Sequence, residues 1–145
     1  MDIDLRTVST AALAYLGDSV IELLARGRLV RRGYSSSKTL NAHAKEFVTA
    51  GAQAAAMERL LPHLSEEEAM YFRRGRNIGH SNTPKNATVA QYRSATGMEV
   101  LFGYLYLTGQ EARAEALFAL AYPDGAHSPE VKEKASGDPV DLKIL

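Results

Sequence analysis

Apolar residues recur at every third or fourth position through most of this chain, a spacing that places them on one face of a helix. The first such stripe consists of Leu13, Leu16, Val20, Ile21 and Leu24. Ser9 or Thr10 can begin this helix, because a hydroxyl oxygen at the N-cap accepts a hydrogen bond from a free backbone N–H. Gly33 is a natural end, since glycine readily adopts the left-handed conformation that follows many helices.

The next helical region covers residues 38–61, which are rich in alanine and contain no proline. The serine run at 35–37 offers its cap, and Pro62 ends it. Gly51 is a possible break within it. The pattern therefore predicts either one long helix here or two abutting ones.

Three further segments complete the prediction. Ser65 followed by three glutamates has the form of a capping box and predicts a helix to about Arg74. Residues 75–86 contain glycines, a proline and small polar side chains, so we expect a loop. Helices are predicted over 88–107 and 111–122. The predicted buried stripe of the first of these is Val89, Tyr92, Ala95, Phe102, Leu105 and Tyr106. No alternating strand pattern competes, so the predicted fold class is all-α.

The length of 145 residues favours one domain. We place it over 1–122 and expect a flexible tail over 123–145, where Pro, Gly, Ser and alternating charges replace the apolar pattern. The absence of cysteine excludes disulfides, thiolate metal ligands and a cysteine nucleophile. The charged N-terminus has no apolar signal core, and no apolar run reaches the roughly 20 residues that span a bilayer. We therefore expect a cytoplasmic protein with no membrane association.

Charge is segregated although the net charge is +0. No Asp or Glu lies within 23–45 or within 69–98. These two basic windows hold 11 of the 17 Lys and Arg residues: Arg26, Arg28, Arg31, Arg32, Lys38 and Lys45 in the first, and Arg73, Arg74, Arg76, Lys85 and Arg93 in the second. Such segregation creates a local positive field that suits a polyanion, while solvated helix faces remain the alternative.

Three carboxylates interrupt apolar helices beside these windows. Asp18 and Glu22 are four residues apart and share a helix face, and Glu99 lies between Met98 and Val100. A carboxylate on an apolar face costs free energy unless it is paired or binds a metal. Ion pairs at the edge of the core are the alternative; a metal site built from oxygen ligands would suit Mg²⁺ or Mn²⁺. Gly17, unfavourable inside a helix, would allow another helix to approach and hold Asp18 rigidly.

The segment 73–86 combines guanidinium, hydroxyl, amide and glycine groups, which suit phosphate and 2′-hydroxyl contacts. It lacks the Phe, Tyr or Trp that would stack on unpaired bases, so we predict contact with a duplex backbone rather than single strands. An exposed linker is the alternative. The candidate RNA-binding residues are Arg73, Arg74, Arg76, Asn77, Ser81, Lys85 and Asn86, with Lys38 and His43 on the second predicted helical region. A packing role is the alternative for His43.

Three segments resemble the ribonuclease III family in the right order. Residues 14–22, Ala-Tyr-Leu-Gly-Asp-Ser-Val-Ile-Glu, resemble its signature motif, and residues 97–107 resemble its second catalytic segment. The Arg-Arg-Gly-Arg-Asn and Pro-Lys-Asn sequences within 73–86 resemble the Mini-ribonuclease III branch, which has no separate double-stranded-RNA-binding domain. The resemblance covers about residues 7–122.

This resemblance implies a helical nuclease domain that works as a homodimer and cuts both strands of double-stranded RNA. It implies Mg²⁺ as cofactor, with Mn²⁺ as a substitute, and Asp18 and Glu99 as the metal-binding catalytic residues. Glu22 matches no family ligand, so we expect a supporting role. The implied cellular task is maturation of the 23S ribosomal RNA precursor. A catalytically silent module that binds structured RNA is the alternative, and a helical scaffold is a second.

The chain also departs from the full-length family. Full-length members usually carry an acid four residues before the motif aspartate and three residues before the second-motif glutamate. Ala14 and Thr96 occupy these positions here. We therefore expect a metal site with fewer protein ligands, and salt-sensitive RNA binding that rests on phosphate contacts.

Overall fold

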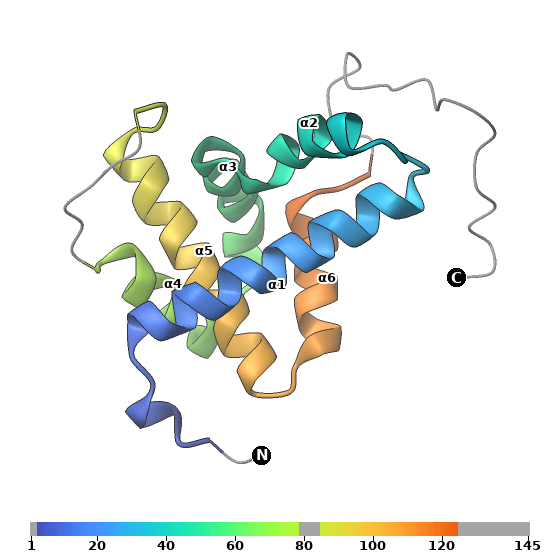
Figure 1. Cartoon of the computed structure of the whole chain (residues 1–145). Coiled ribbons are helices and arrows are strands. Elements are labelled where there is room, and N and C mark those ends of the chain that lie inside the picture. Colours follow the sequence, from blue (N-terminus) through green and yellow to red (C-terminus); the bar gives the residue numbers. More distant parts are fainter. Residues whose placement is uncertain (1–2, 79–84, 125–145) are drawn as a thin grey trace.

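The computed structural model describes residues 3–78 and 85–124, and within them the chain forms helices and no strands. Figure 1 shows their arrangement. The helices are α1 (Thr10–Arg31), α2 (Ser37–Val48), α3 (Ala50–Leu60), α4 (Glu66–Arg76), α5 (Val89–Leu107) and α6 (Glu111–Ala121), with short 3-10 turns η1 (Leu5–Thr7) and η2 (Leu61–His63). The all-α prediction is confirmed.

Side-chain caps fix where five of these helices begin. Ser9, Ser36, Thr49, Ser65 and Thr88 each accept a hydrogen bond from the backbone N–H three residues later. These bonds satisfy N–H groups that have no partner inside the helix. The last two caps are complete capping boxes, in which the third helical residue bonds back to the cap. The predicted starts of α1, α2, α4 and α5 are therefore confirmed.

Two predicted boundaries need correction. The break between α2 and α3 lies at Thr49, whose extended backbone (ψ 153°) and capping hydroxyl start α3, so Gly51 is inside a helix. Helix α4 continues to Arg76, and Gly75 is a buried helical residue rather than the start of a loop. In both places a glycine suggests a break. Gly75 instead serves helix packing, and Gly51 is simply tolerated inside α3.

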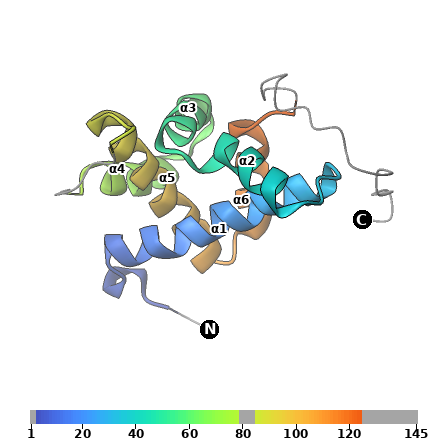
Figure 2. The same ribbon diagram turned by 45° about the horizontal axis from the view of Figure 1, so that its top comes forward.

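Helix α5 is the centre of the fold. Figures 1 and 2 show α1 crossing it on one side, and α3 and α4 also pack against it. Ten of its 19 residues are buried, as expected for a helix surrounded by others rather than one with a single apolar stripe. Two residues of the predicted stripe, Val89 in the first turn of α5 and Tyr106 in its last turn, are exposed. No helix in the described residues is long and apolar enough to cross a membrane.

Candidate active site

The backbones of α1 and α5 touch where they cross. A Cβ atom on Gly17 would lie 1.6 Å from the backbone oxygen of Glu99, and one on Gly103 would lie 2.0 Å from the backbone oxygen of Leu13. Only glycine fits at these two positions. The predicted role of Gly17 in close helix approach is confirmed, and it places Asp18, the next residue, beside Glu99.

The side chains of Asp18 and Glu99 meet at this crossing. Burial, together with the charge of Asp18 and a hydrogen bond with it, raises the pKa of the Glu99 carboxyl from 4.5 to about 8. Asp18 is exposed and Glu99 is partly buried. In the described part of the chain neither carboxylate has an ion-pair partner, so the ion-pair alternative does not apply to them. Two such carboxylates suit a bound cation.

Glu22 is placed differently, one turn after Asp18 on α1. Its carboxylate pairs with Arg26, 3.4 Å away, and both side chains are well exposed. Together with Asn41 they line a hollow of about 470 Å³ between α1 and α2. The ion-pair alternative therefore describes Glu22, and such an exposed pair contributes little stability.

The donor set at the crossing fits a hard divalent ion. Mg²⁺ is commonly bound by one or two carboxylates while water and substrate phosphate oxygens fill its other positions. No group of three or more His, Cys, Asp or Glu side chains with metal-binding spacing occurs among the described residues. Thr96, at one position where full-length relatives carry an acid, is buried and donates its hydroxyl to the backbone oxygen of Tyr92 at 3.0 Å. The two carboxylates would thus hold the ion by themselves.

A second glycine contact joins α4 to α5. A Cβ on Gly75 would lie 2.7 Å from the Cα of Gly97, and a Cβ on Gly97 would lie 2.6 Å from the ring of Phe72. This contact holds the basic end of α4 against Gly97, which lies two residues before Glu99 in α5. The sequence does not predict this contact, because the glycine and the polar residues after it indicate a loop from Gly75; the arginines on both sides of Gly75, which are good helix formers, are the signal that favours a helix.

The arginines at the end of α4 have different surroundings. The side chain of Arg73 is exposed and has no hydrogen-bond or ion-pair partner among the described residues. Arg74 donates to the Thr10 hydroxyl, at 2.9 Å from Nη2. Arg76 lies over the ring of Phe72, 5.7 Å from its centre, while its outer side is exposed. These three predicted RNA-binding residues therefore lie close together but differ in their exposure and in their side-chain partners.

The remaining candidates of this region lie around the gap in the described chain. Asn77 caps the end of α4, and its side-chain oxygen is 3.5 Å from the Nε of Arg76. Lys85 and Asn86 are exposed on the far side of the gap, before α5. Ser81 lies outside the described residues.

Two arginines of the first basic window point inward. Arg28 donates to the backbone oxygen of Tyr122 and lies 4.9 Å from the centre of the Phe118 ring. Arg32 pairs with Glu46 at 3.6 Å and with Asp124 at 3.7 Å. These cations satisfy the carbonyl end of α6 and hold the chain that follows it. The structure thus assigns them to packing, where their charge is not available to a polyanion.

The two candidates on α2 also separate. Lys38 is exposed and has no ion-pair partner among the described residues. His43 is only 5% exposed, stacks on Tyr34 with 4.0 Å between ring centres, and lies 3.0 Å from a Glu46 carboxylate oxygen. The packing alternative therefore describes His43, because a buried ring held on two sides presents no atom to RNA.

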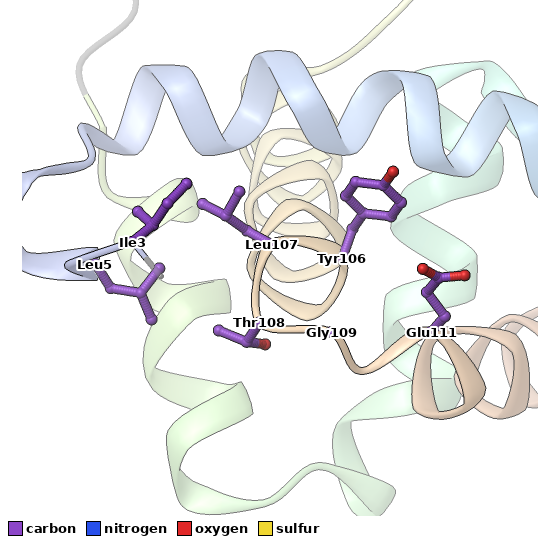
Figure 3. A pocket seen from close by; sticks show the side chains of 7 residues that line it. All are labelled: Ile3, Leu5, Tyr106, Leu107, Thr108, Gly109 and Glu111. Atoms are coloured by element: carbon purple, nitrogen blue, oxygen red, sulfur yellow. The ribbon is translucent and has the colours of Figure 1, made fainter. Parts of the chain in front are cut away.

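A hollow at the C-terminal end of α5 contains little chemistry. Figure 3 shows this hollow of about 690 Å³ at the C-terminal end of α5. Its lining residues are Ile3, Leu5, Tyr106, Leu107, Thr108, Gly109 and Glu111. Glu111 is the charged side chain among them, and the Asp18–Glu99 pair does not line it. The hollow is therefore no competitor for the active site, but it adds apolar surface around Tyr106.

Comparison with known proteins gives consistent matches. The family model of the ribonuclease III domain matches residues 11–110. The Mini-ribonuclease 3 of Symbiobacterium thermophilum is 47% identical over 116 residues, covering 79% of this chain and 89% of that protein. That of Enterococcus faecalis is 42% identical, covering 79% and 88%. The crystal structure of protein FN1578 from Fusobacterium nucleatum has a TM-score of 0.74 at 31% identity, covering 82% of this chain and 95% of that one.

Proposed function

The chain belongs to the ribonuclease III family, and from this premise we propose that it is a metal-dependent endonuclease of double-stranded RNA. The observation that carries the proposal is the Asp18–Glu99 pair, in which two carboxylates meet and form no ion pair with a cation of the described residues. A domain that only binds RNA gains nothing from placing such charges where phosphates approach. A catalytic domain uses them to hold a cation against the scissile phosphate.

We assign the metal to Asp18 and Glu99. When bound there, Mg²⁺ or Mn²⁺ would acidify a water and neutralise the charge of the phosphodiester during hydrolysis. The protein contributes rigidity, since the contact of Gly17 with the backbone of Glu99 fixes one carboxylate against the other. The Glu99 carboxyl, with its pKa of about 8, must give up its proton before both oxygens can hold a cation.

We assign RNA binding to polar residues around the end of α4, together with Lys38 on α2. The residues near α4 are Arg73, Arg76, Asn77, Lys85 and Asn86, with Ser81 in the undescribed segment between them. These groups suit backbone phosphates and 2′-hydroxyls, and the deep major groove of A-form RNA hides the base edges from them. We therefore expect weak sequence preference, and a structured precursor such as that of 23S ribosomal RNA as the cellular substrate.

We further propose that the protein acts as a homodimer in the cytoplasm. Tyr15 is 85% exposed and Leu23 is 69% exposed on α1, and Leu23 also lines a hollow with Tyr106 and Ala114. Large exposed apolar side chains on one helix are typical of an interface. Tyr15 lies three residues before Asp18, so pairing through this face would bring two sites to one duplex.

The dimer has its own test. Tyr15→Arg is expected to give monomers in sedimentation velocity experiments, whereas Met70→Arg, at an exposed apolar residue of α4, is expected to leave the dimer intact. A wild-type protein that sediments as a monomer at micromolar concentration contradicts this part of the proposal.

The nuclease test uses a long perfect RNA duplex with Mg²⁺, with a chelator and with the Asp18→Asn variant. We expect cutting by the wild type alone. Intact duplex under all conditions, together with retained binding, would replace the enzyme by a catalytically silent RNA-binding module. Cutting that survives both the chelator and Asp18→Asn would show that the activity lies elsewhere in the chain.

A further inference from the structure

Arg74 is the one arginine of the α4 end that reaches across to α1. Its Nη2 and Nε atoms donate to the Thr10 hydroxyl at 2.9 Å and 3.3 Å. Its guanidinium also lies over the ring of Tyr71, 5.2 Å from the ring centre. Two of its five N–H donors and one face of its plane are therefore engaged by the protein itself.

The ring beneath Arg74 is part of a longer packed row. Tyr71 stacks on Tyr104 of α5 with 4.0 Å between ring centres and 12° between planes. The Tyr104 hydroxyl donates to a Glu67 carboxylate oxygen at 2.6 Å, back on α4. Both rings are buried. The row thus gives Arg74 a rigid support, because neither ring can shift without breaking a stack or a hydrogen bond.

Both ends of this link lie on helices that build the catalytic pair. Thr10 is the first residue of α1, eight residues before Asp18, or about 12 Å along the helix. Arg74 precedes Gly75, whose contact with Gly97 fixes α4 close to Glu99. Arg74 therefore closes a triangle: α1 packs on α5, α4 packs on α5, and Arg74 joins α4 directly to α1.

We propose that Arg74 is a positioning residue that sets α1 relative to the basic end of α4, and that it is not a phosphate contact. This inference rests on the proposed nuclease function and divides the arginines of the α4 end by role. Arg73, whose side chain is exposed and has no partner among the described residues, contacts phosphate. Arg74 fixes the position of α1, and therefore of Asp18, relative to the duplex that Arg73 binds.

Salt dependence separates the two roles. Each phosphate contact contributes about 0.9 to the slope of log affinity against log salt concentration. Duplex binding is measured in an Asp18→Asn background, where the RNA stays intact. Arg73→Gln is expected to lower the slope by about one contact, and Arg74→Gln to leave it unchanged. If Arg74→Gln also lowers the slope by about one contact, the proposal is overturned. Because this experiment measures binding, it tests the role of Arg74 even if the wild type proves unable to cut RNA.

Kinetics of the cleaving protein test positioning from the α1 side. Thr10→Val removes the acceptor and keeps the shape of the side chain. It is expected to lower kcat by about tenfold or more with little change in KM, since a small misplacement of reacting groups is costly. Arg74→Gln should match it, the double variant should be no worse than either, and Thr10→Ser should restore kcat. A normal kcat in Thr10→Val, with the protein fully folded by circular dichroism, overturns the assignment.

Discussion

Two poorly exposed glutamates, Glu99 and Glu68, lie in surroundings of opposite charge. Glu99 lies where α1 crosses α5, and Glu68 lies in the ion pair between α4 and α6. Glu99, at the crossing, faces Asp18, and burial with this neighbour raises its pKa to about 8. Glu68 accepts hydrogen bonds from the Arg113 guanidinium at 2.8 Å and 2.9 Å and from the backbone N–H of Ser65. The Arg113 hydrogen bonds hold the pKa of Glu68 below its usual range.

The difference separates a structural glutamate from one that we propose to be catalytic. Glu68 is 5% exposed, and its charge is matched by a guanidinium and a capped helix start, so ionisation supports the fold. Ionisation of Glu99 opposes the fold, because the carboxylate is shielded from water and faces the carboxylate of Asp18. A fold retains such a pair when something else binds there, which is why perturbed carboxylates mark functional sites. Burial alone would not have distinguished the two residues.

The largest expected effect is on RNA cleavage. Glu99→Gln should lower kcat by about 1000-fold or more, about 4 kcal/mol of activation free energy, because an amide is a poor ligand for a divalent ion. Glu68→Gln should stay within about twofold of wild type. The measurement is single-turnover cleavage of a duplex in Mg²⁺. Equal losses in both variants would mean that the two glutamates differ less than their surroundings indicate.

The next effect is on the stability of the crossing that holds the pair. Gly17→Ala should lower the free energy of unfolding by about 3 kcal/mol or more, because the new Cβ would lie 1.6 Å from a backbone oxygen and α1 must move. Gly27→Ala in the same helix meets only the Arg31 side chain, at 3.4 Å, and should raise stability by up to about 1 kcal/mol. Urea denaturation measures both. A harmless Gly17→Ala would refute the close contact.

The pH dependence of stability, measured in chelator, should have opposite signs at the two glutamates. The folded-state pKa of Glu99 is raised, so its contribution is fully present below about pH 4.5 and is lost as pH rises towards 8, by at most about 1.4 kcal/mol per pH unit. Glu99→Gln should therefore be more stable than wild type at pH 8, with the advantage shrinking towards pH 5.

Glu68 has a lowered pKa, so its contribution is present above about pH 4.5 and is lost as pH falls through the folded-state value. Glu68→Gln should cost stability at pH 7 and progressively less in acid. Chemical denaturation at unit pH steps checks both signs. A constant difference between wild type and Glu99→Gln from pH 5 to pH 8 would contradict the carboxylate pair.

The smallest expected effect sharpens the structural side of the comparison. Arg113→Met removes the guanidinium and keeps much of the apolar stem, which should cost about 1 kcal/mol because the arginine is partly exposed. Cleavage by this variant should equal that of wild type after correction for the folded fraction. Thermal unfolding and the duplex assay measure the two quantities. A cleavage defect in a fully folded variant would connect this ion pair to the active site.

The sequence by itself determined the helices and most of their starts, and it pointed to the two carboxylates that we propose as catalytic. Caps at Ser9, Ser65 and Thr88 act within three residues, and apolar periodicity acts within a turn or two, so both can be read locally. The signature around Asp18 and the segment around Glu99 carried the family resemblance. Gly17 was recognisable as a close-approach residue because a glycine inside a helix is otherwise unfavourable.

Only the tertiary structure decided which charged groups are available for chemistry. Arg28 and Arg73 both lie in basic windows without Asp or Glu, yet the first caps the end of α6 and the second is exposed. Glu22 and Glu99 both interrupt apolar helices, yet one pairs with Arg26 and the other meets Asp18. Arg26 is only four positions from Glu22, but the partners of Arg28 and Glu99 lie 94 and 81 positions away and are brought to them by the packing of the helices. No local pattern encodes such partners, because charge pairing depends on distance in space rather than on distance along the chain.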